Sequence, residues 1–404
     1  LPHRERKERH VLSSRERILR SIAGEEVDHV PFCQLLFSGL RQRCAGERDF
    51  ARRQLEAGMD VVVDLGAPPL RLAPEVRVEC RKEGASPHPL LHKTYRTPAG
   101  DLHTVVEQTP DWPHGDDIPL FSDYLIPRAR KFLVCEEKDL EPLQFLLMPP
   151  TAEAVALYRE RARQRAAFAA AHGLATRAGF SRLPDTLCWL CGCEAFATWG
   201  ITRPRLFGRL VERVARTQEA QIAAALEARP HLLIDPQWYG TPFLSPSLYR
   251  EFLARPLCRR VEMAHCAGAR FCAIATANVH PFAALFRDVQ MDALFGVDPL
   301  EGGWNLPRAK QELGSHICLW GGVNAYLSVV HATPAETRAA VRYAMESLAP
   351  GGRFILAAVD DIRIENHQRS PAWPAVWENV MAMVDQWRRL SGQRIPARDA
   401  HPEP

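Results

Sequence analysis

Apolar positions along this chain follow two patterns: stripes at helical spacing and short continuous runs. Near the start, Ile18, Leu19 and Ile22 form an apolar stripe at helical spacing, and Ser13 with Glu16 three residues later forms a capping box ahead of it. We therefore expect the first helix to begin beside Ser13.

Short apolar runs separated by amphipathic stretches make up most of the remaining chain. Residues 29–37 and 59–65 are two such runs on either side of a charged helical stretch at 47–57, an order typical of strand, helix and parallel strand. Further runs, each followed by an amphipathic helix, lie at residues 174–180, 231–235, 270–275, 293–297, 317–320 and 354–358. This alternation predicts an α/β fold, a (β/α)8 TIM barrel, with a doubly wound sheet as the alternative that periodicity alone leaves open.

One segment departs from the alternation. Residues 93–109 carry β-branched side chains on both sides of the turn-forming Pro98–Asp101, which predicts a β-hairpin inserted into the barrel. Residues 110–127 are rich in Pro, Asp and Gly and are expected to cross the surface or cover a site, and helices are expected at 138–147 and 151–171. With no linker evident, we predict one domain over residues 11–390 and a flexible tail over 391–404.

Composition narrows the function classes. The 404 residues are 46% hydrophobic and 25% charged, and 51 basic against 48 acidic residues leave a formal charge of only +3, so we expect neither nucleic acid nor a membrane as partner. No run approaches the roughly 20 apolar residues of a membrane span, and a charged start leads us to expect a cytoplasmic protein. The eleven cysteines are expected to be reduced and mostly buried.

Four segments of the chain carry motifs that resemble those of a known family. SSRERILRSIAGEEVDHVPF at residues 13–32 is similar to the helix that leads into the first barrel strand of the uroporphyrinogen decarboxylase superfamily. DPQWYGTPFLSPSLYREFLARPLCRRV at 235–261 resembles its strand-end aspartate, aromatic loop and following helix. DPLEGGWNLPRAKQELGSHICLWGGVNA at 298–325 and TPAETRAAVRYAMESLAPGGRFILAAVDDI at 333–362 match the order of its last βα units. The resemblance implies a TIM barrel with its site at the carboxyl ends of the strands.

The resemblance is stronger to the methyltransferase-like branch than to the true decarboxylases. Decarboxylases grip the carboxylates of a tetrapyrrole with an early arginine segment, whereas residues 35–47 here offer only Arg41 and Arg43. The inserted hairpin resembles an insertion in corrinoid-linked relatives. The implied activity is methyl transfer from a small, O-methylated aromatic or similar donor to a corrinoid carried by a partner protein. Tetrapyrrole decarboxylation and a non-catalytic, ligand-binding barrel are the alternatives, and a homodimer is compatible with all three.

The resemblance also bears on metal binding. Zinc-dependent relatives carry a His-x-Cys pair after one strand and a Cys after the last, and these positions fall on Ile274, Thr276 and Asp360. Isoleucine cannot bind zinc and threonine binds it poorly, so we expect no zinc there and no tightly bound cofactor. Cys188, Cys191 and Cys193 offer another set of thiols, for which packing beside Trp189 is the favoured interpretation.

Candidate catalytic residues follow from strand ends. Asp360 stands where the resemblance places a metal ligand or histidine, and it could protonate a leaving oxygen, or merely cap a loop or pair with Arg363. Asp235 ends another strand, and His280 could move protons near neutral pH, although a histidine beside a proline is more often a packing residue. The remaining candidates are expected to contact substrate, with turn, packing or exposed-loop roles as their alternatives: Trp189, Trp238, Tyr239, Thr276, Asn278, Asp361 and His367.

Overall fold

The computed structural model describes residues 11–84, 87–179, 182–275, 277–364 and 371–391. Seven parallel strands form its main sheet in the order β1-β6-β7-β8-β9-β10-β11. Their bounds are β1 Val62–Asp64, β6 Ala175–Ala178, β7 Leu232–Pro236, β8 Arg270–Ile274, β9 Ala293–Val297, β10 Cys318–Asn324 and β11 Phe354–Val359. The predicted runs at 174–180, 231–235, 270–275, 293–297, 317–320 and 354–358 are therefore confirmed as strands.

The predicted first strand is the exception. Residues 29–37 contribute only parallel bridges, from Phe32 to Leu356 in β11 and from Cys33 to Asp60 just before β1. Pro31 has no N–H to donate, and the side-chain amide of Gln34 pairs with both the N–H and the C=O of Ala358, so regular backbone pairing stops after two residues. The predicted eight-strand barrel is therefore confirmed only in part. Seven strands are regular, and residues 32–33 form bridges to β11 at one edge of the sheet and to the residue just before β1 at the other.

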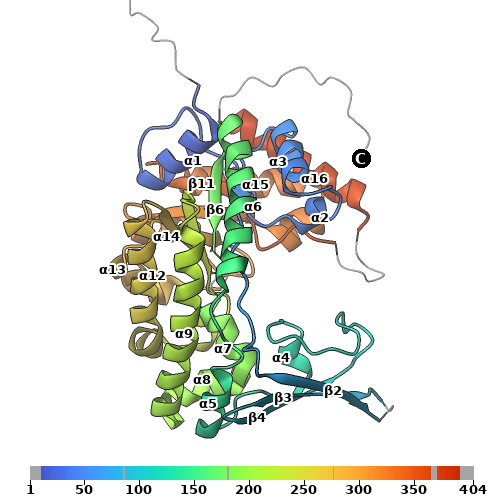
Figure 1. The fold of residues 1–404 in the computed structure, drawn as a ribbon. Helices are drawn as coiled ribbons and strands as arrows, with labels where there is room; N and C mark the ends of the chain where they lie inside the picture. The colour runs from blue at the N-terminus through green and yellow to red at the C-terminus, as the bar shows by residue number, and fades with distance from the viewer. Residues whose placement is uncertain (1–10, 85–86, 180–181, 276, 365–370, 392–404) are drawn as a thin grey trace, which may run out of the picture.

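The helices lie between the strands in sequence (Figure 1). The long ones are α6 Ala152–Ala171, α9 Pro204–Leu226, α12 Ala254–Cys266, α15 Pro334–Leu348 and α16 Trp373–Leu390. Shorter helices are α3 Glu47–Glu56, α7 Leu183–Cys191, α8 Cys193–Thr202, α13 Ala283–Asp288 and α14 Leu306–Leu313. The helix expected over 138–147 is wrong in length: a 3-10 turn at Glu137–Asp139 leads into α5 Leu140–Leu143, which contains Pro142.

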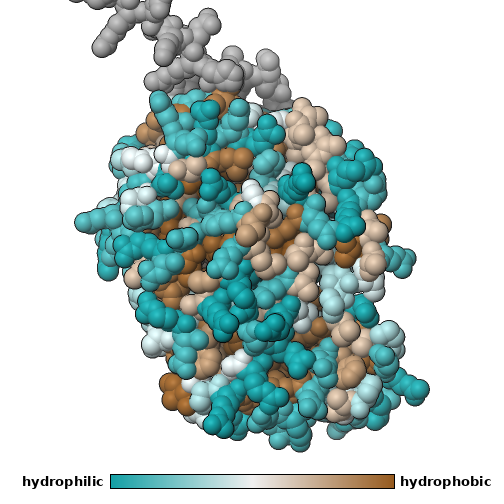
Figure 2. Space-filling view, turned by 60° about the vertical axis from the view of Figure 1, so that its left-hand side comes forward, coloured by the Kyte–Doolittle hydropathy of each residue, from teal (hydrophilic) through white to brown (hydrophobic). Residues whose placement is uncertain are grey.

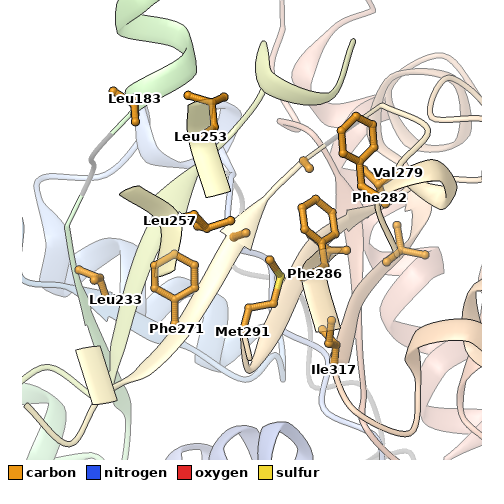
Figure 3. Packing of buried hydrophobic residues seen from close by; sticks show 14 of the residues in the cluster. Leu183, Leu233, Leu253, Leu257, Phe271, Val279, Phe282, Phe286, Met291 and Ile317 are labelled. Atoms are coloured by element: carbon orange, nitrogen blue, oxygen red, sulfur yellow. The ribbon is translucent and has the colours of Figure 1, made fainter. Parts of the chain in front are cut away.

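The two faces of the main sheet pack into separate cores, as the two-residue period of a strand requires. One face packs against the helices, where Phe271 of β8 lies near Leu257 and Met291 (Figure 3). The other face forms an interior cluster of fully or nearly fully buried side chains: Ile18, Ile22, Cys33, Leu35, Ala175, Leu232, Ile234, Cys272, Ile274, Ala293, Phe295, Cys318, Trp320, Ile355 and Ala357.

Helix α1, Ser14–Ala23, closes the amino-terminal end of this interior cluster. The capping box is confirmed, since Glu16 accepts a hydrogen bond from Ser13 N–H and Ser13 Oγ accepts one from Glu16 N–H. Its stripe delivers Ile18 and Ile22 into the cluster, and Arg17 is held by Asp28 and Asp60.

The inserted hairpin is confirmed and is part of a larger antiparallel sheet. Strands β3 Leu90–Thr97 and β4 Gly100–Glu107 are flanked by β2 Arg77–Glu83 and β5 Ala129–Lys131. This sheet lies far from α1, toward the carboxyl ends of the main strands (Figure 1).

The surface of the protein is mixed in hydropathy, and its cysteines differ in burial. Hydrophilic side chains are interspersed with hydrophobic ones on the face shown in Figure 2, and no helix among the described residues has the length and hydropathy needed to cross a membrane. All eleven cysteines are unpaired, as expected, but only five are buried: Cys33, Cys188, Cys191, Cys272 and Cys318.

Candidate active site

A cavity of about 700 Å³ lies at the carboxyl ends of the main strands. Trp238 and Tyr239 follow β7, Arg182 follows β6, and Asp360 with Asp361 follows β11. In parallel α/β sheets this end gathers the loops that bind ligands. The remaining wall is formed by Leu36, Ser38, Asp123, Tyr124, Arg128, Pro242, Phe243 and Arg363.

Asp360 is the residue of this wall with the most perturbed carboxyl group. Asp360 is exposed to solvent through the cavity, but the protein packed around its carboxyl group desolvates it and raises its pKa to about 6. The charge of Arg363 lowers this pKa, while Asp361 raises it. The backbone has φ +67°, a left-handed conformation that aspartate tolerates better than most residues.

Asp361 has a structural use at the same edge. Its carboxylate accepts hydrogen bonds from Ser38 N–H, at 2.7 Å, and from the Ser38 hydroxyl. Ser38 begins the short helix α2, Ser38–Arg41, whose N–H groups have no helical partner. Asp361 therefore fixes the loop after β11 against the segment that follows residues 32–33.

The aromatic side of the cavity comes from the turn after β7. Tyr239 N–H donates to Asp185 Oδ1 at 2.9 Å, and its ring lies 5.7 Å from that of Phe243. Burial raises the pKa of the Tyr239 hydroxyl, so this group stays a neutral donor. The indole Nε1 of Trp238 is buried and makes no hydrogen bond among the described residues, so it remains available to a ligand acceptor.

Arg182 and Asp123 connect these aromatic residues to Trp189. The Arg182 guanidinium lies 4.6 Å from the ring centre of Trp238 and 5.8 Å from that of Trp189, within cation–π range. Asp123 accepts from Trp189 Nε1 at 3.1 Å and from the Tyr239 hydroxyl at 3.4 Å. Trp189 itself lines a neighbouring cavity and not the one that holds Asp360, which it reaches only through Arg182 and Asp123.

Asp235 does not share the cavity with Asp360, contrary to the prediction. Only 1% of Asp235 is exposed, and its carboxylate accepts from Arg260 Nη1 at 2.7 and 3.0 Å and from Gln237 at 2.8 Å. It lies at the level of the last residues of β7, beneath the turn that carries Trp238. A carboxylate that is enclosed and shared in this way holds the strand end in place rather than contacting a ligand.

His280 and Asn278 also lie away from the cavity. Asn278 Oδ1 accepts from His280 N–H, which turns the chain into the 3-10 helix His280–Phe282. The ring of His280 then lies on Trp304, at 5.3 Å between ring centres, and its Nδ1 is 2.9 Å from a carboxylate oxygen of Glu312 in α14. Neither residue lines the cavity that holds Asp360, and the proton transfer and substrate contact predicted for them stay predictions. Thr276 and His367 lie outside the described residues.

Of the three positions where zinc-dependent relatives carry ligands, Ile274 and Asp360 lie among the described residues. Ile274 is fully buried in the interior cluster and offers no ligand atom. Elsewhere in the described part of the chain, no three His, Cys, Asp or Glu side chains are grouped so that they could hold a metal. Cys188 and Cys191 pack in the hydrophobic core, where burial raises the pKa of both thiols.

Sequence reasoning missed several wall residues for which a signal existed. Arg182 follows β6 and obeys the same strand-end rule that selected Asp360. Asp123, Tyr124 and Arg128 come from residues 110–127 and the helix α4, Leu125–Arg128, directly after them, a loop already expected to cover a site. Ser38 lies in a short helix with no distinctive pattern, so only its contact with Asp361 identifies it.

Comparison with known proteins shows the family to which the chain belongs. A sequence model described as "Uroporphyrinogen decarboxylase (URO-D)" matches residues 116–373. The match covers more than half of the chain, and the chain belongs to the uroporphyrinogen decarboxylase family.

Solved structures agree on the fold. The chain is similar to a methyltransferase from Methanosarcina mazei, with 19% identity and a TM-score of 0.57, over 94% of this chain and 99% of that one. It is also similar to a B12-independent methionine synthase from Shewanella sp. W3-18-1, with 8% identity over 90% and 97% of the two chains, but the TM-score of 0.46 is too low to support an inference. No curated protein matches the sequence.

Proposed function

We propose that this protein transfers a methyl group from a small, O-methylated aromatic donor to a corrinoid held by a partner protein. Membership of the uroporphyrinogen decarboxylase family and the methyltransferase named among the structures of similar fold support the reaction class. The observation that carries the proposal is the position of Asp360 in the wall of a cavity that is also lined by aromatic side chains; desolvation raises the pKa of this carboxyl group to about 6. We also propose that the protein is cytoplasmic and that residues 32–33 close the main sheet as its eighth strand.

The reaction needs a proton at the leaving oxygen. When the bond between the methyl carbon and the oxygen breaks, both bonding electrons stay on the oxygen, which becomes a phenolate unless it is protonated. Asp360 donates that proton and is left as a carboxylate, which the nearby Arg363 stabilises. The methyl carbon forms its new bond to the acceptor; a reduced corrinoid supplies the nucleophile for this step.

The cavity offers a place for the aromatic donor. Trp238, Tyr239 and Phe243 present ring faces on one side, and an aromatic donor can stack on these. The unpartnered Trp238 Nε1 and the neutral Tyr239 hydroxyl can donate to oxygen substituents of the donor. Because Ile274 cannot act as a ligand, no step of this mechanism runs through zinc.

Decarboxylation of a tetrapyrrole is less well supported by the charge of the cavity. Arg128, Arg182 and Arg363 are balanced by Asp123, Asp360 and Asp361. Arg41 instead pairs with Glu47, and Arg43 donates to the carbonyl of Gly39, so neither adds to the wall. A polycarboxylate would need an excess of arginines.

The test is a methyl-transfer assay with purified protein, a corrinoid carrier protein reduced to cobalt(I), and a series of methoxyaromatics. We expect the absorbance of methylcobalt to grow with at least one donor, and Asp360→Asn to lower the rate about 100-fold, the scale of general-acid catalysis. Asp235→Asn would disturb the core, so the matched control is Asp288→Asn, at an exposed aspartate of α13 outside the cavity wall, which should keep the rate within a few-fold.

Two outcomes contradict the proposal in different ways. No methylcobalt with any donor, together with donors that raise the melting temperature, would favour a non-catalytic, ligand-binding barrel. Turnover that is unchanged in Asp360→Asn would keep the reaction but remove the proposed acid.

A further inference from the structure

A second cavity, of about 590 Å³, lies between the inserted sheet and the main barrel. Strand β3 contributes Lys93 and Tyr95, α7 contributes Trp189, and α9 contributes Gln218. It shares one wall residue, Arg182, with the cavity that holds Asp360. Nothing in the proposed methyl transfer uses it.

The first unusual feature of this second cavity is Gln218. Only 4% of Gln218 is exposed, and its Nε2 donates to Thr186 Oγ1 at 3.0 Å. Its Oε1 is buried on the cavity wall and accepts no hydrogen bond from any described residue. A buried acceptor without a donor is costly, and such a group at a cavity indicates a ligand that supplies an O–H or N–H.

The second feature is Arg71, in the segment after β1. Its backbone is anchored by hydrogen bonds in both directions with Met148, at 3.0 and 3.2 Å. Its guanidinium makes one long contact, 3.4 Å from Nη1 to the carbonyl of Leu72, its Nε is buried without a partner, and no carboxylate of the described residues forms an ion pair with it. Arg71 is therefore a fixed, largely unused cation.

The charge on the wall as a whole is positive. Arg71 and Lys93 face a single carboxylate, Asp117, which accepts a hydrogen bond from the Lys93 ammonium at 2.6 Å. The third cation of the wall, Arg182, also lines the first cavity and lies near Asp123 and Asp185. An anion in the cavity would compensate this charge, and a carboxylate matches the planar fork of a guanidinium.

We propose that this second cavity binds a small carboxylate that also carries a hydroxyl or amino group. Arg71 binds the carboxylate, Gln218 Oε1 accepts from the hydroxyl or amino group, and Trp189 with neighbouring leucines covers the apolar part of the molecule. Occupancy of such a cavity would also fix the inserted sheet against α7 and α9.

Isothermal titration calorimetry with the full chain tests the assignment. The probes are 4-hydroxyphenylacetate, phenylacetate without the hydroxyl, the neutral methyl ester of 4-hydroxyphenylacetate, and phenyl phosphate. We expect 4-hydroxyphenylacetate to bind about tenfold more tightly than either phenylacetate or the ester. Absence of binding by all four, or equal affinity for acid and ester, would overturn the proposal, and binding of phenyl phosphate alone would overturn the choice of a carboxylate.

Variants assign each preference to one residue. Arg71→Met should abolish the preference for acid over ester, and Gln218→Leu should abolish only the preference for the hydroxyl. The matched control is Arg77→Met, at an exposed arginine of β2 outside the cavity wall, which should bind like the wild type. Circular dichroism and melting temperature establish that each variant is folded.

Asp360→Asn separates this inference from the proposed methyl transfer. Binding of 4-hydroxyphenylacetate that survives in Asp360→Asn but is lost in Arg71→Met supports the second cavity whether or not the protein transfers methyl groups. Binding that is lost in Asp360→Asn and retained in Arg71→Met would place the ligand in the first cavity and would contradict the inference.

Discussion

At the scale of single residues, two strand-end aspartates with the same sequence signature have opposite surroundings. Asp360 and Asp235 both follow apolar runs, but Asp360 opens into a cavity while Asp235 is enclosed with Arg260. The sequence predicts which strand end each occupies. It does not reveal the partner, because Arg260 comes from a helix 25 residues away whose orientation depends on packing.

The raised pKa of Asp360 predicts a pH dependence of stability. Because its folded pKa, about 6, exceeds the ordinary value of 3.8, the protonated form favours folding, and this contribution is present below about pH 4 and lost as the pH rises through 6. Wild type should therefore lose unfolding free energy relative to Asp360→Asn between pH 4 and 6, with a constant difference above.

Urea unfolding of both proteins across this pH range measures the effect. Arg363→Met, which removes the cation that lowers this pKa, should move the upper end of the window above pH 6. A difference between wild type and Asp360→Asn that does not change with pH would show that Asp360 has an ordinary pKa.

The buried pair of Asp235 and Arg260 predicts a large loss of stability when it is broken. Both side chains are 1% exposed, so Arg260→Met removes the cation beside a buried carboxylate and should cost about 3–5 kcal/mol of unfolding free energy. Arg259→Met is the matched control in the same helix, since Arg259 pairs with Glu212 and Glu219 nearer the surface and should cost below about 1 kcal/mol. Equal losses in denaturant unfolding would mean that the buried pair has no special role.

At the scale of elements, the sequence predicts the features that depend on interactions between neighbouring residues. The capping box, the apolar runs of the barrel and the turn-formers at Pro98–Asp101 all depend on neighbouring residues, and all were predicted. The prediction of a regular strand over residues 29–37 failed because Pro31 and the Gln34 side chain replace backbone pairing with β11. Strand β2 was missed because all seven of its residues are exposed, so it has no apolar period.

Lys93 predicts how the inserted sheet holds the loop beside both cavities. Its buried ammonium donates to Asp117 and to the carbonyl of Ile118, at 2.6 and 2.7 Å, and so ties β3 to residues that lead to Asp123. Lys93→Met should speed amide hydrogen exchange across residues 116–124 about tenfold, corresponding to a lost tie of about 1.4 kcal/mol. Lys82→Met removes an exposed pair with Asp116 and should leave this exchange unchanged; the same increase in both variants would contradict the role of Lys93.

At the scale of the whole molecule, the two ends of the barrel divide the tasks. Helix α1, which lies far from the inserted sheet (Figure 1), fills the amino-terminal end with Ile18 and Ile22. Both cavities are lined by residues that follow the main strands. Residues at the amino-terminal end of such folds serve stability, and those at the carboxyl end serve chemistry.

This division predicts the cost of emptying the interior. Ile18→Ala, at a fully buried position, should lower the unfolding free energy by about 2–5 kcal/mol. Ile201→Ala, at an isoleucine of α8 that is 73% exposed, should change it by less than about 0.5 kcal/mol. Similar values for the two variants in chemical denaturation would mean that α1 is not part of the core.

The interior cluster contains three thiols, Cys33, Cys272 and Cys318, and burial raises the pKa of each. Alkylating reagents attack the thiolate and need access to it, so they can modify these sulfur atoms only after the strands separate. Mass spectrometry of iodoacetamide adducts at these three positions would thus time the opening of the barrel itself, while Cys80, Cys135 and Cys266, which are exposed, react from the start and give an internal clock for the reagent.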